Sequence, residues 1–248
     1  MTRRDKLRLT SCSGNASEVT FANGVRGGNE KRVKALLRAN WPNIEPLLLA
    51  KLSFVLTLDR DTSLDDAATD VGDAGVPDVD KVTMTVTAFQ LGIIAKRPGV
   101  IRAFLQKILD IPDEDERFQL LKKVLETKTF LDFPKDPKLY DKDDRSLDGM
   151  NAFHLGAKYS PGALNQIFYH LNDNNFMEED EIKSLLEATD DQIRQTPLHI
   201  AAAHPAGGGY SLAARYIILY QYDRLTRRAV KFNRVSYIID LKISYNLL

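Results

Sequence analysis

Hydrophobic residues recur at helical spacing in several segments of this chain, and polar stretches separate those segments. Phe118, Leu121 and Leu125 fall on one face of the segment 114–126, and the apolar residues of the segment 177–188 show the same spacing. Acidic residues begin both segments, where they favour the positive N-terminal end of a helix. The pattern therefore predicts two amphipathic helices over 114–126 and 177–188.

A helix-loop-helix pattern is repeated along the chain and is clearest over 191–221. There Thr196 is suited to cap the start of a helix, and Pro197 is suited to its first position because proline lacks an amide hydrogen that would be unpaired there. Three glycines, Gly207 to Gly209, separate this helix from a second apolar segment. Four copies of the pattern are expected, near residues 19–40, 85–108, 146–172 and 191–221.

These segments resemble ankyrin repeats, in which a turn, a short Thr-Pro-Leu-His helix and a second helix recur with a period of about 33 residues. Thr-Pro-Leu-His-Ile-Ala-Ala over 196–202 is the strongest match, and 28–37 matches the second half of a repeat. The resemblance implies an all-α fold, an ankyrin-like helical solenoid of about four helix-loop-helix repeats with short hairpin turns and extra inserted helices. It also implies that His154 and His199 form hydrogen bonds within and between repeats.

Long insertions separate the four copies. The equivalent residues Phe21, Phe89, Phe153 and Leu198 are 68, 64 and 45 residues apart, which exceeds the family's period of about 33 residues. The stack of repeats is therefore expected to be interrupted.

Three positions depart from the family's pattern. Ala22 and Gln90 stand where the first two repeats would have the His, which predicts that these repeats lack its polar contacts. Arg194 stands where the turn before the last repeat would have Gly. The hairpin of that repeat is therefore expected to differ from the others.

The segments outside the repeats differ in composition. Residues 59–80 are rich in Asp and contain Gly and Pro, which predicts a mobile acidic loop that buries too little apolar surface to become ordered. Residues 1–18 are expected to form a tail before a repeat domain over 19–222. Residues 223–248 form a basic C-terminal tail, in which alternation over 237–245 is typical of a strand.

Charge, hydropathy and cysteine content exclude several classes of partner and location. The 34 basic and 34 acidic residues cancel, which favours neither a nucleic-acid nor a lipid partner. The apolar run 47–58 predicts a buried helix or strand, because a membrane span requires roughly 20 apolar residues. The single Cys12 cannot form an internal disulfide, and the N-terminus lacks the apolar part of a signal peptide. We therefore expect a cytoplasmic chain without a membrane span.

The candidate chemical motifs are incomplete. The four His residues lack the spacing of a zinc site, and the sequence has no Gly-x-Ser-x-Gly elbow of a serine hydrolase. Residues 59–70 carry oxygen side chains at several positions of a calcium-binding loop, but Leu64 occupies the place of the required Gly. We therefore expect a monomer with no enzymatic activity, no metal and no cofactor.

The resemblance implies a non-catalytic protein that mediates protein–protein interaction as a scaffold or adaptor. Two alternatives remain open: the cytosolic N-terminal ankyrin region, or a truncated product, of a larger ankyrin-bearing membrane channel, and the targeting module of an enzyme whose catalytic domain lies outside this chain. The candidate partner-binding residues occupy the expected hairpins just before the first helix of a repeat. They are Lys81, Thr83, Thr85, Asp144, Arg145, Asp148, Asp190, Asp191, Gln192 and Arg194.

Overall fold

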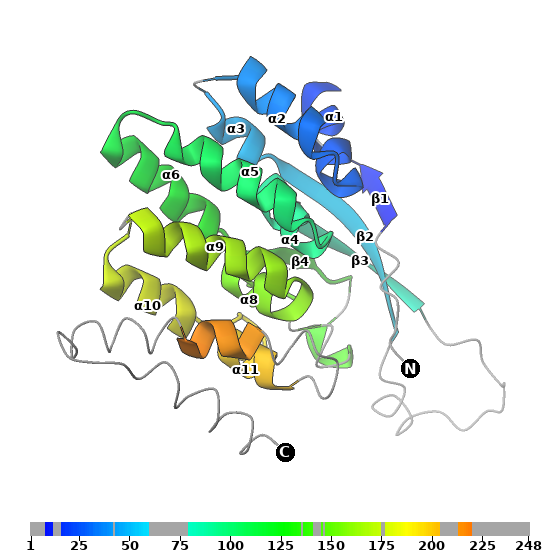
Figure 1. Ribbon diagram of the computed structural model, residues 1–248. Coiled ribbons are helices and arrows are strands. Elements are labelled where there is room, and N and C mark those ends of the chain that lie inside the picture. The colour runs from blue at the N-terminus through cyan, green and yellow to red at the C-terminus, as the bar shows by residue number, and fades with distance from the viewer. Residues whose placement is uncertain are drawn as a thin grey trace, which may run out of the picture.

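Helices make up most of the structure, a computed structural model (Figure 1). It describes residues 8–11, 16–41, 43–59, 79–134, 136–140, 145, 147–174, 177–203 and 213–219. The segments 60–78 and 220–248 lie outside the described residues. Residues 59, 79 and 80 of the expected acidic loop belong to strands instead. The rest of that expected loop and the expected basic tail with a strand concern residues that the structure does not describe.

Helices follow one another in pairs along the chain. The pairs are α1 (Ala16–Gly27) with α2 (Glu30–Ala39), α4 (Ala88–Ile94) with α5 (Pro98–Leu109), and α8 (Ala152–Tyr159) with α9 (Pro161–Asn174); α11 (Pro197–Ala203) is followed by a helix over 213–219. The first helices pack in chain order, α1 on α4, α4 on α8 and α8 on α11. The second helix α5 contacts both α2 and α9, so the pairs lie side by side (Figure 1).

Polar side chains fix where the first helices begin. Thr87 and Asn151 cap α4 and α8, and each accepts a hydrogen bond from a backbone N–H of the first turn. Thr196 does the same for α11, whose first residue is Pro197. These side chains satisfy amide groups that would otherwise lack a partner at the start of a helix. The helix start predicted at Thr196 and Pro197 and the cap predicted at Asn151 are therefore confirmed.

The helices share one hydrophobic core. The Phe104 ring of α5 lies 5.7 Å from the Phe21 ring of α1 and 6.0 Å from the Phe89 ring of α4, measured between centroids. Further along, the Phe153 ring of α8 lies 5.5 Å from the Phe168 ring of α9. These aromatic contacts join α4 with α5 and α8 with α9, and they connect the first pair to the second through α1 and α5.

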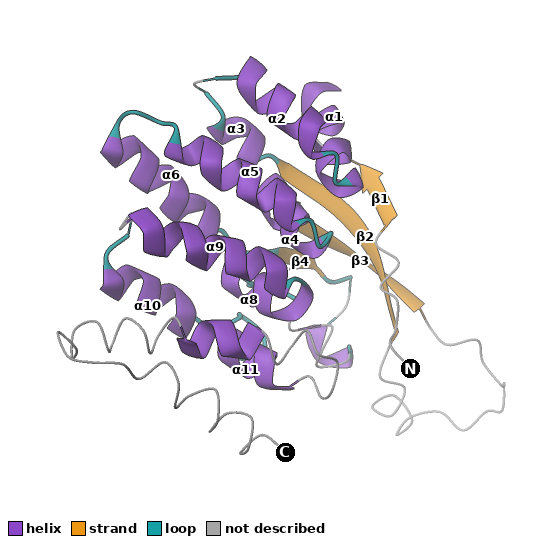
Figure 2. Ribbon diagram, in the orientation of Figure 1, coloured by secondary structure: helices purple, strands orange, loops and turns teal. Residues whose placement is uncertain are grey.

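A four-stranded antiparallel sheet lies beside the helices (Figure 2). Its strands, in both chain and spatial order, are β1 (Arg8–Ser11), β2 (Lys51–Asp59), β3 (Val79–Thr87) and β4 (Phe130–Asp132). The expected N-terminal tail over 1–18 thus contributes β1 and the start of α1. The expectation of an all-α fold is correct for most described residues and wrong for these strands.

Alternation of buried and exposed side chains explains the strands. Over 51–56 of β2 and 81–86 of β3, every second residue faces the core and the intervening residues face away from it, as in an antiparallel sheet with one covered face. This pattern has a period of 2 and is incompatible with a helix. The buried residues are Leu52, Phe54, Leu56, Val82, Met84 and Val86.

The insertions also contain helices. Helix α6 (Glu114–Glu126) begins after Asp113, whose Oδ1 accepts a hydrogen bond from the Glu116 backbone N at 2.8 Å. Helix α10 (Glu179–Glu187) is linked to α6 by Lys122, which donates to Glu181 at 2.8 Å, and this bond raises the pKa of Lys122. The two helices predicted over 114–126 and 177–188 are confirmed. The short helices α3 (Glu45–Leu48) and η1 (Pro137–Leu139) complete the described elements.

Candidate functional site

The predicted contact residues Lys81, Thr83 and Thr85 lie on strand β3, rather than in a short hairpin turn. Lys81 is exposed and both Thr residues are half-buried, whereas their neighbours in the strand face the core. Thr85 pairs with Phe130 of β4, and Thr83 pairs with Asp132. Directly paired residues of an antiparallel sheet share a face, so Phe130, which is 59% exposed, stands next to the predicted threonines.

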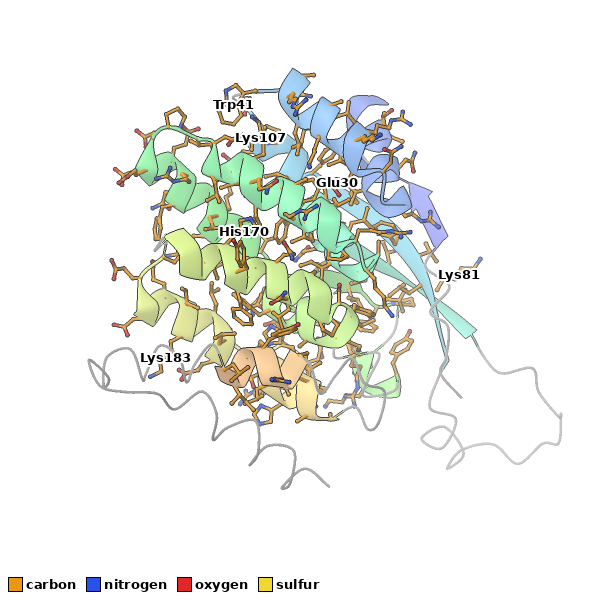
Figure 3. All side chains as sticks on the ribbon, viewed as in Figure 1. Glu30, Trp41, Lys81, Lys107, His170 and Lys183 are labelled. Atoms are coloured by element: carbon orange, nitrogen blue, oxygen red, sulfur yellow. The ribbon has the colours of Figure 1, made fainter. Side chains whose placement is uncertain are left out.

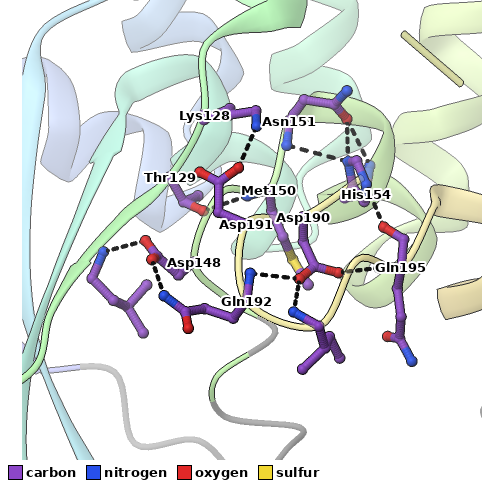
Figure 4. A network of polar contacts seen from close by, with 12 residues as sticks. Lys128, Thr129, Asp148, Met150, Asn151, His154, Asp190, Asp191, Gln192 and Gln195 are labelled. Atoms are coloured by element: carbon purple, nitrogen blue, oxygen red, sulfur yellow. Dashed lines mark hydrogen bonds and ion pairs between the residues drawn. The ribbon is translucent and has the colours of Figure 1, made fainter. Parts of the chain in front are cut away.

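Asp148 connects this sheet to the two turns that precede α8 and α11 (Figure 4). Its Oδ1 accepts a hydrogen bond from the backbone N of Leu131 in β4 at 2.9 Å, and its Oδ2 accepts one from Gln192 Nε2 at 3.0 Å. The backbone O of Asp148 also accepts from the backbone N of Asp191 at 3.3 Å. One carboxylate thus holds the edge strand and both turns together.

Thr129 ties the chain before β4 to the turn before α8. Its backbone N donates to Met150 O at 2.9 Å, and its backbone O accepts from Gly149 N at 3.0 Å. The Thr129 hydroxyl also accepts from Met150 N at 3.0 Å. Backbone pairing therefore links the residue just before β4 to the turn over 147–150.

Asp190 shapes the turn before α11 from the inside. It is 1% exposed, and its carboxylate accepts three backbone hydrogen bonds, from Gln192 N at 3.1 Å, Ile193 N at 2.7 Å and Gln195 N at 2.7 Å. These bonds compensate the cost of burying a charged group. Asp190 therefore supports the turn, while the adjacent Asp191 is exposed and forms an ion pair with Lys128 at 2.5 Å.

The sequence-predicted positions are thus brought together only in part. Asp148, Asp191 and Gln192 contact one another, and the β3 residues lie along the same sheet; Asp144 lies outside the described residues, and Arg145 is described without its two neighbours in the chain. Sequence reasoning missed Phe130, Lys128 and Asp132, because β4 has three residues and gives too short an alternation to indicate a strand. We call the following set the sheet–turn surface: Lys81, Thr83, Thr85, Lys128, Phe130, Asp132, Asp148, Asp191 and Gln192.

Arg194 and Gly149 occupy the same place in the two turns and have the same left-handed backbone, with φ of +57° and +73°. A side chain at position 149 would clash, because an added Cβ would lie 2.3 Å from Asp191 Cγ and 2.5 Å from Asp191 N. The last turn has Arg194 in place of the family's glycine, and the turn still forms. The left-handed backbone of Arg194 costs roughly 1–2 kcal/mol of strain.

Replacing Arg194 by Gly is therefore expected to stabilise the protein by about 0.5 kcal/mol, since relief of strain exceeds the added freedom of the unfolded chain. Gly149→Ala is expected to cost about 2 kcal/mol, because it adds both strain and a clash. Urea unfolding followed by circular dichroism measures both changes. If Arg194→Gly is less stable than Arg194→Ala, the backbone at position 194 is not strained and the prediction is wrong.

His154 links α8 to the turn before α11. Its Nδ1 accepts a hydrogen bond from Asn151 N at 3.3 Å, and its Nε2 donates to Gln195 O at 3.0 Å. The side chain is fully buried, and this burial lowers its pKa from the ordinary 6.5 to about 4, although the Gln195 carbonyl and Asp190 act in the opposite direction. His154 is therefore neutral near pH 7 and joins two neighbouring units, and the contacts expected of it within and between repeats are both present.

Gln90 makes the same kind of contacts in α4, which corrects the expectation that this unit lacks them. Its Oε1 accepts from Thr87 N at 2.8 Å, and its Nε2 donates to Thr127 O, beyond the end of α6, at 2.7 Å. The amide of Gln offers one acceptor and one donor, as a neutral imidazole does. His199 caps its own helix through Thr196 in the same way.

The described residues offer little for metal or membrane chemistry. Among them, no three His, Cys, Asp or Glu side chains are grouped closely enough to hold a metal ion. Within the same part of the chain, every helix is too short or too polar to cross a bilayer. What the arrangement can do is present an exposed aromatic ring and fixed polar groups to a partner.

Comparison with known proteins gives no family for this chain: no family model, curated protein sequence or solved structure matches it.

Proposed function

We propose that this chain is a non-catalytic, ankyrin-like module that binds another protein through the sheet–turn surface. The observation that carries this proposal is the Asp148 carboxylate, which joins β4 at 2.9 Å and the turn before α11 at 3.0 Å. Because these bonds fix residues from three distant segments in one arrangement, little conformational freedom is lost when a partner binds.

The ankyrin-like interpretation is supported by the repeated chemistry of the helix starts. Thr87, Asn151 and Thr196 each cap a first helix, and the residue three positions later returns a side-chain contact to the cap. The first helices pack on one another in chain order. In repeat proteins such packing leaves the sequences of the turns and connecting strands free to vary. Contacts with partners are expected at these turns and strands.

Phe130 is the best candidate for the centre of the contact. Exposed aromatic side chains surrounded by polar groups are typical of positions that contribute most to binding between proteins. Among the described residues only Phe130 and Tyr169 are large hydrophobic side chains with high exposure, at 59% and 58%. Tyr169 lies on α9 and packs edge-on against His170, so it provides a matched control.

Photo-crosslinking from position 130 in cells tests the proposal, with the crosslinker at position 169 as the control. We expect a discrete protein partner at 130 that is absent at 169. With that partner purified, Phe130→Ala should raise the dissociation constant at least about tenfold, which corresponds to about 1.4 kcal/mol. Equal crosslinking from both positions, or an unchanged dissociation constant, would remove the sheet–turn surface from the proposal.

A further inference from the structure

Basic residues are concentrated on the first two helix pairs. Segments 26–39 and 95–110 contain nine basic residues but only two acidic ones, Glu30 and Asp110, although the whole chain has equal numbers of both. The acidic excess lies elsewhere, mainly in 59–80 and 178–187. We call the basic residues of these two segments the basic face: Arg26, Lys31, Arg32, Lys34, Arg38, Lys96, Arg97, Arg102 and Lys107.

Helices α2 and α5 carry most of this face and lie side by side in the same direction (Figure 3). Near their starts, Arg102 Nη2 lies 3.4 Å from Glu30 Oε1. Just beyond the end of α2, Lys107 Nζ lies 3.8 Å from the centroid of the Trp41 ring. The basic face therefore extends along two adjacent helices, from Glu30 to Trp41.

The acidic residues within this face are already engaged. Glu30 is bonded to Lys34 at 2.7 Å as well as to Arg102, and the Lys34 hydrogen bond lowers the pKa of the Glu30 carboxyl, so it stays charged. Asp110 pairs with Lys107 at 3.1 Å. In contrast, four exposed basic residues have no ion-pair partner in the described part of the chain: Lys31, Arg32, Arg38 and Lys96.

Arg97 shows that part of the face is held in place. Its Nε donates to the backbone O of Arg26 at 3.2 Å. The side chain crosses Gly28, where an added Cβ would lie 2.8 Å from Arg97 Cδ. A guanidinium that is ordered before binding loses less side-chain entropy when an anionic group binds to it.

We propose that the basic face binds an acidic polypeptide segment, at a second surface distinct from the sheet–turn surface. Uncompensated positive charge on α2 and at Lys96, just before α5, attracts a negative partner and speeds its association. A polypeptide fits better than a nucleic acid, because Glu30 lies within the face and the Trp41 ring is covered by Lys107 instead of being free to stack on a base. It also fits better than a membrane, since the exposed large apolar side chains of the described residues, Phe130 and Tyr169, lie on other elements.

Titration of the full-length chain with a deca-glutamate peptide tests this proposal. Trp41 is the single Trp of the chain and lies at one end of the basic face, so its emission reports binding there without a label. We expect a saturable change in Trp41 emission that weakens at least about tenfold between about 0.05 and 0.5 M salt, because salt screens these charges. Binding that is detected calorimetrically but leaves Trp41 emission unchanged would overturn the proposed location.

Two triple variants with equal changes of net charge test whether peptide binding depends on the basic face or only on the net charge of the protein. The combination of Lys31→Ala, Arg32→Ala and Arg38→Ala is expected to weaken peptide binding at least about tenfold and to preserve α2, because Ala favours helix formation. The control combines Lys51→Ala, Lys138→Ala and Lys183→Ala, which lie on other elements and outside both proposed surfaces, and should change binding less than about twofold. Equal losses in both variants would overturn the proposal.

Two further probes distinguish other classes of partner. A single-stranded oligothymidine of the same charge and vesicles containing phosphatidylserine are titrated under the same conditions. Weaker binding of both than of deca-glutamate supports the proposal. Tighter binding of either one would overturn it and assign the basic face to nucleic acid or to a membrane. Loss of the partner crosslinked at Phe130 would leave this result unaffected, so the two proposals fail independently.

Discussion

Phe104→Ala is expected to destabilise the protein by about 3–5 kcal/mol. The Phe104 side chain is fully buried, and its ring lies between Phe21 of α1 and Phe89 of α4. Truncation removes apolar surface from the core and leaves a cavity between two helix pairs, which the surrounding helices fill only in part. Urea unfolding measured by circular dichroism gives the change in the free energy of unfolding.

Tyr169→Ala is the control, because its ring is 58% exposed and its loss should change stability by less than about 0.5 kcal/mol. The single Trp41, between the ends of α2 and α5, should report the same unfolding transition as the helices do. A loss below about 1 kcal/mol in Phe104→Ala would mean that the first two helix pairs do not share the core described above.

Acidification from pH 7 to pH 4 is expected to remove up to about 3 kcal/mol of stability through His154 alone. The pKa of His154 is about 4 in the folded protein and about 6.5 in the unfolded chain. Between these values the unfolded chain binds more protons, so stability falls as the pH falls. The contribution is fully present above pH 6.5 and is lost progressively towards pH 4. Urea titrations at several pH values measure it.

His154→Gln separates this effect from other ionisations. Gln90 already makes the equivalent two hydrogen bonds in α4, at 2.8 Å and 2.7 Å. His154→Gln should therefore retain most of the stability at pH 7. Its stability should not show the decrease between pH 6.5 and 4 that His154 causes. His154→Ala should be destabilised at pH 7, because Asn151 N and Gln195 O lose their partner. An unchanged pH dependence in His154→Gln would show that His154 is not the group responsible.

The helix starts could be predicted because they depend on neighbouring residues. Thr196 with Pro197, Asn151, and Asp113 with Glu116 combine a capping side chain with an apolar stripe within a few positions. Such local signals indicate a helix whatever packs on it later. The prediction for Gln90 was wrong because it considered only that His is absent at this position. The side-chain amide of Gln offers one hydrogen-bond acceptor and one donor, as a neutral imidazole does.

The sheet was missed because its evidence is distributed over distant segments. Strands β2 and β3 alternate clearly, but their pairing joins Lys51 to Thr87 across a long insertion, and β1 comes from a segment expected to be a tail. Asp148 was predicted as a contact residue, whereas its bonds to Leu131 and Gln192 could not be inferred from sequence. Pairings between remote segments depend on the whole fold, which a local pattern does not contain.

The proposed binding function requires that β3, β4 and the turn before α11 form one continuous contact surface. The most direct test measures the dissociation constant of the purified, crosslinked partner for one variant from each segment: Thr85→Arg, Phe130→Ala and Asp191→Ala. Each variant is expected to weaken binding at least about tenfold, and Tyr169→Ala is expected to stay within about twofold of the unmodified chain. Weakening by a variant from only one segment, or by Tyr169→Ala to the same extent, would contradict a continuous surface.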